Sequence, residues 1–420
     1  MPVPAARRPA RIHPAWVVIL AGVCAALHVG KLAPAIAPLQ QALGMSLVQA
    51  GFLLSGVQLA GMTLGVAFGL LADGLGARRS MVLGLCLLAA ASALGGFAQG
   101  VPMLLALRAL EGFGFLMVAL PAPALVRQLV APGRVSVVLG LWGAYMPFAT
   151  ALALLVGPLW IAALGWRAWW WLLAAACLAM AAWLASAVPA SAPAVAAAAA
   201  RPAARAPAWG RRLQQTLAAP GPWLVALTFA MYSGQWLAVI GFLPAIYTQA
   251  GVSGGATGLL TALAAAVNML GNVASGRLLQ RGARAPVLLA AGFAVMALAA
   301  AAAFAGTAGA PMAGQDGGGL VPALRYGAVL LFSGVGGLIP ATLFALALRL
   351  APNEHTLSTT VGWVQQWSSL GQFAGPPLVA WMASSAGGWH RTWLATGLCC
   401  LVGLALTLAL THLLGRQAQR

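Results

Sequence analysis

Long apolar stretches, each long enough to cross a lipid bilayer as a helix, follow one another along almost the whole chain. About 20 apolar residues are needed to span the hydrocarbon core. Breaks at proline, glycine and charged residues divide these 420 residues into about twelve such stretches. Because the stretches are continuously apolar rather than alternating, they predict an all-α membrane protein and exclude an outer-membrane β-barrel. The expected spans are 14–38, 48–72, 81–99, 102–127, 135–160, 168–188, 222–247, 256–278, 286–306, 320–348, 357–383 and 392–414.

Charged residues are scarce, and positive charges dominate among them. They make up 6% of the chain, against 62% apolar residues, whereas soluble globular chains carry roughly 25% charged residues. This composition excludes a soluble enzyme and a disordered protein. The formal net charge of +18 would suggest nucleic-acid binding only on a soluble domain. We therefore expect no nucleic-acid partner and explain the charge by membrane topology.

The arginines are distributed unevenly between the loops expected on the two sides of the membrane. With an even number of spans, the positive-inside rule places both termini on the cytoplasmic side, with only Arg167 and Arg391 outside. The abundance of arginine and alanine suggests a GC-rich bacterial genome, so we expect a bacterial inner membrane. We interpret the first apolar run as an uncleaved helix, because it continues to about Pro38 and contains Lys31. The cytoplasmic cations are then Arg7, Arg8, Arg11, Arg78, Arg79, Arg127, Arg134, Arg201, Arg205, Arg211, Arg212, Arg277, Arg281, Arg284, Arg349, Arg416 and Arg420.

The two halves of the chain resemble each other in sequence. The matches begin at an offset of 207 residues, and the offset grows toward the end of each half. Two repeats with a substrate held between them are a transporter architecture. The matching pairs include Trp16 with Trp223, His28 with Gln235, Gly44 with Gly251, Met62 with Met269, Trp142 with Trp363, and Gly165-Trp166 with Gly388-Trp389.

The repeat divides the chain into three parts. We expect an N-terminal six-helix bundle over 1–188 and a C-terminal six-helix bundle over 222–420. Between them, 189–221 is rich in proline and alanine. This composition predicts a cytoplasmic linker, with a short surface helix near 209–217.

The loop after the second span carries the pattern G-x-L-x-D-x-x-G-x-R-R, formed by Gly69, Asp73, Gly76, Arg78 and Arg79. This pattern resembles the signature of the major facilitator superfamily, and with twelve spans and the repeat the resemblance covers nearly the whole chain. It implies a cytoplasmic latch in which Asp73 helps to hold the two halves together while the protein faces outward. The second half has Gln280 where the acid would be, so any latch there lacks that charge.

Two further patterns are similar to motifs of the same superfamily. Arg108, Glu111 and the glycines after them resemble a fourth-span motif whose arginine is implicated in proton transfer. Gly157-Pro158 matches the antiporter motif only in part, so we do not infer antiport. The His28 and Lys31 pair and the phrase 142–147 resemble the cyanate-permease-like branch, which implies small anions or small polar organic substrates.

A few charged residues lie inside the expected spans, where each costs about 2.5–3.5 kcal/mol at the centre. Lys31, Arg108 and Glu111 lie at similar depths, roughly 9–13 Å below the outer surface at 1.5 Å per residue. His28 shares a helix face with Lys31, as Arg108 does with Glu111. If both faces line a central cavity, the excess positive charge favours an anionic substrate. Arg325 lies nearer a span end and reads as an interface anchor.

Each of these residues also has a simpler interpretation. Arg108 and Glu111 could neutralise each other as a structural pair, and Lys31 could extend toward the outer surface or pair with Glu111 across helices. His28 could pack or bond to the backbone. Other polar and aromatic residues near mid-span are candidates for substrate contact or for helix packing, namely Gln58, Trp142, Tyr145, Gln235, Trp236, Asn268, Trp363, Gln366 and Trp367.

Together these patterns predict a secondary active transporter for proton-coupled uptake of a small anionic or polar solute. Lys31 and Arg108 would attract the anion, His28 and Gln235 would supply hydrogen bonds, and Glu111 would carry the proton. A proton-driven exporter and a non-transporting membrane sensor are the alternatives. We expect a monomer that is not an enzyme and has no cofactor or metal. We interpret the five cysteines as packing residues, namely Cys24, Cys86, Cys177, Cys399 and Cys400.

Overall fold

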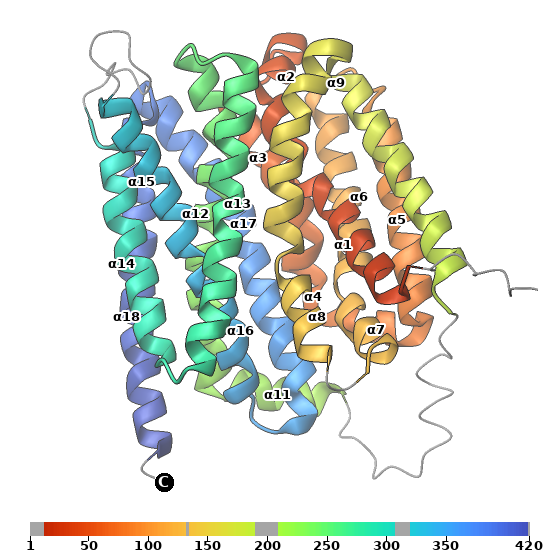
Figure 1. Cartoon of the computed structure of the whole chain (residues 1–420), viewed down its shortest axis with the longest axis vertical. Coiled ribbons are helices and arrows are strands. Elements are labelled where there is room, and N and C mark those ends of the chain that lie inside the picture. Colours follow the sequence, from red (N-terminus) through yellow and green to blue (C-terminus); the bar gives the residue numbers. More distant parts are fainter. Residues whose placement is uncertain (1–11, 132–133, 190–208, 307–319, 419–420) are drawn as a thin grey trace, which may run out of the picture.

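The computed structural model describes residues 12–131, 134–189, 209–306 and 320–418, and in these ranges it is almost entirely helical, with no strand. The long helices run roughly side by side along the longest axis of the molecule (Figure 1). The short helix α11 lies across one end, at the bottom of Figure 1, and we refer to that end as the α11 end.

We call the helices up to residue 187 the first half and those from residue 220 onward the second half. The first half contains α1 (Pro14–Gly30), η1 (Ala33–Ala35), α2 (Ile36–Leu43), α3 (Leu47–Ser55), η2 (Gly56–Gln58), α4 (Leu59–Leu75), α5 (Ala77–Gly95), α6 (Val101–Ala119), α7 (Ala122–Leu129), α8 (Val135–Gly143) and α9 (Tyr145–Ala187).

The helix α11 (Trp209–Ala218) precedes the second half and matches the short helix expected near 209–217. The second half contains α12 (Pro220–Gln249), α13 (Gly254–Gln280), α14 (Ala285–Phe304), α15 (Leu320–Gly336), α16 (Leu338–Arg349), η4 (Glu354–Thr356), α17 (Leu357–Ala386), η5 (Trp389–Arg391) and α18 (Thr392–Ala418).

The described helices make twelve membrane crossings, as the sequence predicts. Ten described segments are long and apolar enough to cross a membrane. One of them, α9, has 43 residues and turns at Gly165, whose φ of 82° suits glycine, so it makes two crossings. The thirty-residue α17 makes the remaining crossing. It is less apolar than the ten because it carries Gln365, Gln366, Ser368, Ser369 and Gln372.

The first two crossings are each interrupted in the middle. Helix α1 ends at Gly30, a turn containing Lys31 follows, and the chain resumes as η1 and α2. Pro34 explains the first interruption, because proline has no N–H to continue the helical ladder. In the second crossing, α3 gives way to η2 at Gly56, where a Cβ would lie 3.1 Å from the Cβ of Arg108. Each interruption leaves the last carbonyl groups of the preceding helix without intrahelical partners.

The two halves meet along two seams. Helices α3 and α4 pack against α17, and α9 packs against α13. Small residues allow close approach at the first seam, since a Cβ on Gly51 would lie 2.8 Å from Pro377 and one on Gly65 would lie 3.1 Å from Gln366. Polar residues can therefore contact each other directly across the seam.

Candidate functional site

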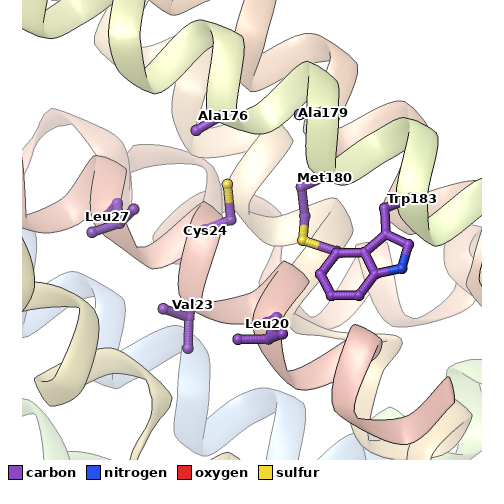
Figure 2. Close-up of a pocket in the computed structure, with 8 residues that line it drawn as sticks. All are labelled: Leu20, Val23, Cys24, Leu27, Ala176, Ala179, Met180 and Trp183. Carbon is purple, nitrogen blue, oxygen red and sulfur yellow. The ribbon is translucent and has the colours of Figure 1, made fainter. Parts of the chain in front are cut away.

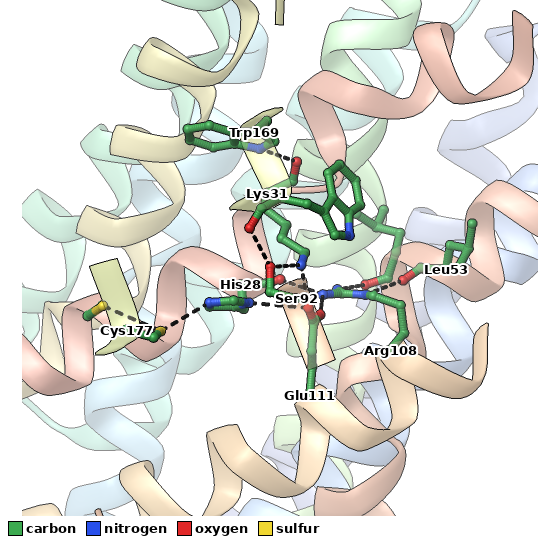
Figure 3. Close-up of polar contacts among 11 residues, drawn as sticks. His28, Lys31, Leu53, Ser92, Arg108, Glu111, Trp169 and Cys177 are labelled. Atoms are coloured by element: carbon green, nitrogen blue, oxygen red, sulfur yellow. Dashed lines mark hydrogen bonds and ion pairs between the residues drawn. The ribbon is translucent and has the colours of Figure 1, made fainter. Parts of the chain in front are cut away.

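Lys31, Arg108 and Glu111, predicted to share one depth, and His28, predicted to share a helix face with Lys31, meet in a single buried cluster. His28, Lys31, Arg108 and Glu111 are each at most 1% exposed. They come from α1, the turn after it, and α6, with α5 and α9 packed around them (Figure 3). Among the described residues, their side-chain hydrogen bonds and ion pairs all lie within the first half.

Glu111 is the centre of this cluster. Its Oε2 accepts a hydrogen bond from Nη1 of Arg108 at 2.6 Å. Its Oε1 accepts from Nζ of Lys31 and lies 3.4 Å from Nδ1 of His28. The Arg108–Glu111 pair follows from the spacing of three residues on one helix. The Lys31–Glu111 pair is the cross-helix alternative that the sequence left open.

Lys31 is held by its surroundings as well as by Glu111. Its Nζ donates to Oγ of Ser92 at 3.1 Å and lies 4.6 Å from the ring centroid of Trp170, a cation–π distance. Trp169 donates from Nε1 to the Lys31 carbonyl oxygen at 3.0 Å. These contacts hold the ammonium group inside the first half, rather than extended toward a membrane surface.

Arg108 joins the carboxylate to the interrupted helices. It donates from Nη1 to the carbonyl oxygen of His28 at 2.7 Å and from Nε to that of Leu53 at 2.9 Å. Its Nη2 lies 3.4 Å from the carbonyl oxygen of Leu54. These carbonyls lie in the last turns of α1 and α3, so one guanidinium group satisfies the ends of two broken helices and the Glu111 carboxylate.

A second polar region lies on the seam between the halves. Gln58, the last residue of the η2 turn that interrupts the second crossing, donates from Nε2 to Oε1 of Gln372 at 2.9 Å. Gln366 donates to the Met62 carbonyl oxygen at 2.9 Å and accepts from the Val66 amide at 3.2 Å. Gln366 is therefore at the contact between α4 and α17, where alternating access would require bonds to break.

Four of the five aromatic candidates fall into two separate groups, and the fifth, Trp236, donates from Nε1 to Oγ of Ser333 at 3.1 Å. Trp142 and Tyr145 stack on each other with ring centroids 4.3 Å apart, and the Trp142 ring abuts Gly22 of α1. Trp363 forms edge-to-face contacts with Trp223 and Trp367 in the second half. Nε1 of Trp363 is buried and has no hydrogen-bond partner within the described part of the chain.

Gln235 does not join the charged cluster. It donates from Nε2 to the Met231 carbonyl oxygen at 2.9 Å, and Sγ of Cys400 donates to its Oε1 at 3.3 Å. Both contacts lie in the second half. They mirror the first half, where Nε2 of His28, the repeat counterpart of Gln235, lies 3.2 Å from Sγ of Cys177.

This mirrored contact involves a residue that the sequence analysis missed as a functional candidate. The offset of 223 residues that aligns Gly165-Trp166 with Gly388-Trp389 also aligns Cys177 with Cys400. The sequence therefore carries a signal for Cys177 that the interpretation of the cysteines as packing residues disregards. For Ser92, Trp169 and Trp170, which surround Lys31, spacing alone gave no comparable signal.

The latch residues are described in part. Gly76 caps the start of α5 with a φ of 82°, and Arg78 donates from Nη2 to the carbonyl oxygen of Ala185 in the last turn of α9. A cation there complements the end of the helix. Arg79 is exposed. The surroundings of Gly69 and the side chain of Asp73 lie outside the described residues, so the proposed latch stays a prediction.

Comparison with known proteins identifies the fold and the family. Over 167 residues the chain is 30% identical to the tetracenomycin C resistance and export protein of Streptomyces glaucescens. This match covers 39% of the chain but only 31% of the relative, so the chain spans about a third of the curated relative it matches.

Two solved structures of a bacterial homologue of the human lysosomal transporter Spinster are similar in fold. Both are inward-facing. The unoccupied one has a TM-score of 0.75 at 15% identity, over 96% of this chain and 97% of that one. The occupied one has a TM-score of 0.75 at 16% identity, over 97% and 98%. The family model of the Major Facilitator Superfamily matches residues 18–356. The chain therefore belongs to the major facilitator superfamily and is a transporter of small-molecule solutes by family.

Proposed function

We propose that this protein is a proton-coupled secondary transporter that takes up a small anionic or polar solute by alternating access. The observation that carries the proposal is Glu111, a carboxylate buried inside the bundle with three hydrogen-bonding groups directed at it. A buried ionisable group in a membrane protein usually serves function. Protonation of this group is the step that couples the proton to the rest of the molecule.

Formal charge supports an anionic solute. Lys31 and Arg108 bring two positive charges to the cluster, and Glu111 brings one negative charge. Because excess charge is costly away from water, an anion that approaches the cluster is favoured. In this conformation no member of the cluster is more than 1% exposed, so direct contact requires one of the cations to move.

The contacts indicate which cation moves. Arg108 is held by carbonyl oxygens of two broken helices in addition to Glu111. Within the described residues, the Lys31 ammonium group contacts the Ser92 hydroxyl and the Trp170 ring besides the carboxylate. Protonation of Glu111 therefore releases Lys31 more readily than Arg108. Lys31 then binds the anion, while Arg108 stays bonded to the carbonyl oxygens of the two broken helices.

Alternating access then requires the halves to separate at the α11 end and at the opposite end in turn. The bonds of Gln58 and Gln366 across the seam are between neutral groups, and each contributes only about 1 kcal/mol net. Such bonds stabilise one conformation but are weak enough to break when the halves separate. We propose that the α11 end faces the cytoplasm, with both termini there, and that the chain works as a monomer in a bacterial inner membrane.

Transport in proteoliposomes tests the coupling. Wild-type protein should accumulate a small anion when a proton gradient is imposed, and Glu111→Gln should lose that response. Exposed Glu354, in η4, provides the matched control, and Glu354→Gln should behave as wild type. A full response to the pH gradient in Glu111→Gln would refute the proposed role of Glu111.

Export is the second candidate, because the curated relative that matches part of the chain is an export protein. The Trp223, Trp363 and Trp367 group would suit a larger apolar solute. Right-side-out and inside-out vesicles distinguish the two directions. Uptake predicts that the solute accumulates in right-side-out vesicles when an inward proton gradient is imposed. Export predicts that the solute accumulates in inside-out vesicles instead.

A further inference from the structure

Two cysteines from different parts of the first half lie in contact. Sγ of Cys24 in α1 is 3.6 Å from Sγ of Cys177 in α9, although 153 residues separate them in sequence. A disulfide requires a sulfur–sulfur distance of about 2.05 Å. The two thiols therefore need only a small approach, and both belong to helices that pack extensively against each other.

Cys24 lines an apolar groove. The groove has a volume of about 310 Å³ and lies between α1 and α9 (Figure 2). Its walls include Leu20 and Trp183, which are 41% and 37% exposed. In a membrane-spanning bundle such an outward apolar groove faces lipid. Cys24 lines it and Cys177 does not, so a molecule dissolved in the bilayer reaches the Cys24 sulfur first.

Cys177 has a proton acceptor on its other side. Its Sγ is 3.2 Å from Nε2 of His28, and Nδ1 of the same ring is 3.4 Å from Oε1 of Glu111. The arrangement suits an imidazole that donates from Nδ1 to the carboxylate and accepts the thiol hydrogen at Nε2. A thiolate is the nucleophile in disulfide chemistry, so this contact prepares Cys177 to attack.

We propose that Cys24 and Cys177 are an oxidisable dithiol, modified by lipid-soluble hydroperoxides that enter the groove. The Cys24 sulfur attacks one peroxide oxygen, an S–O bond forms as the O–O bond breaks, and the Cys24 thiol proton passes to the departing alkoxide, which gives Cys24 sulfenic acid and an alcohol. Cys177 then passes its proton to His28, and its thiolate attacks the Cys24 sulfur. The S–O bond breaks, and the departing hydroxide takes the proton from His28 to leave as water. The peroxide is reduced, and the two thiols become one disulfide.

Oxidation also changes the charged cluster. In the disulfide, Cys177 has no hydrogen to donate to His28, so the oxidation state of the pair alters a neighbour of Glu111. Cys400 and Gln235 in the second half form the mirrored contact. The residue beside Cys400 is its sequence neighbour Cys399, whose side chain leaves the helix about 100° away. The second half therefore offers a natural comparison for the first.

The test uses the purified full chain in lipid nanodiscs, treated with cumene hydroperoxide or with hydrogen peroxide. We expect the loss of two thiols per chain on cumene hydroperoxide treatment, and a peptide linking Cys24 to Cys177 by mass spectrometry. Hydrogen peroxide, which avoids the apolar phase, should act severalfold more slowly. Equal rates for the two peroxides would overturn the route through the groove, and the absence of the linked peptide would overturn the dithiol.

Variants assign the roles. Oxidation of the Cys177→Ser variant should stop at Cys24 sulfenic acid, which dimedone traps. The Cys24→Ser variant should form neither the sulfenic acid nor the disulfide. His28→Gln should accumulate the sulfenic acid in a chain that keeps both thiols, which a merely structural role would not produce. Cys86, exposed on α5, is the control, and Cys86→Ser should oxidise as wild type. Dimedone labelling of Cys177 in Cys24→Ser would reverse the proposed order and refute it.

Discussion

Nε2 of Gln58 donates a hydrogen bond to Oε1 of Gln372 at 2.9 Å, and this bond joins the two halves of the molecule. Both side chains are buried, at 2% and 5% exposed. Gln58 ends η2, the 3₁₀ turn that interrupts the second crossing, and Arg108 binds carbonyl oxygens of α3 just before that turn. The seam is therefore connected to the charged cluster through one short stretch of backbone.

We expect Gln58→Leu and Gln372→Leu each to destabilise the protein by about 1–3 kcal/mol, because each leaves a buried amide without its partner. The double variant should lose less stability than the two single variants lose together, since neither amide then remains. Reversible unfolding in mixed micelles measures the free energy of unfolding of all three variants. Strictly additive losses would show that the two amides do not interact.

Arg108 should not be replaceable by lysine. An ammonium group cannot span the carbonyl oxygens of two helices and Glu111 at once, as the planar guanidinium does. Arg108→Ala leaves Glu111 without one partner and should cost about 3–5 kcal/mol, and Arg108→Lys should recover only part of that loss. Thermal unfolding in detergent measures both.

Exposed Arg79 on α5 gives the control for this substitution. Arg79→Lys should leave the unfolding temperature close to that of wild type. An Arg108→Lys variant that unfolds at the wild-type temperature would mean that a single charge near Glu111 is enough, and that the bonds to the broken helices contribute little.

The depth of the charged residues followed from the sequence, but their surroundings did not. Counting residues from the span ends placed Lys31 and Glu111 at one level, and the two side chains do meet. Counting gives the rise along a helix and the residues that share a face, but not the direction in which that face points. The cluster packs against α5 and α9 inside the first half, so the expected exposure to a central cavity is not seen in this conformation.

The helix interruptions were only partly foreseeable. Pro34 is a local signal for the break after α1, because proline removes a backbone donor. Gly56 gives no such signal, since its role comes from the approach of Arg108, which is remote in sequence. Gln235 shows that a repeat in sequence does not predict the surroundings of a residue. The repeat pairs Gln235 with His28, but His28 contacts the charged Glu111, whereas Gln235 contacts Cys400.

Replacing Lys31 with glutamine should separate charge from folding. Glu111 keeps its bond to Arg108 in that variant, and the glutamine amide can still donate to the carboxylate. We therefore expect Lys31→Gln to remain folded but to lose most anion uptake in proteoliposomes. Lys31→Glu should be more damaging to anion uptake than Lys31→Gln, because it places a second carboxylate beside that of Glu111. Ser92→Ala removes one bond to the ammonium group and the bond from the Ser92 hydroxyl to the Trp170 carbonyl oxygen, but it leaves the charge of Lys31 in place, so it should retain uptake. Unchanged uptake in Lys31→Gln would remove Lys31 from the solute path.

Gly22 allows the Trp142 ring to lie directly against α1. A Cβ at this position would collide with the ring edge of Trp142, and the Trp142 ring also stacks on Tyr145. Gly22→Ala should therefore cost about 1–3 kcal/mol through overpacking, and tryptophan fluorescence should change as the ring shifts. Gly143, near the same ring but with open space around its Cβ position, is the control. Gly143→Ala should leave stability and fluorescence close to wild type, and equal behaviour of the two variants would show that the Trp142 contact does not constrain α1.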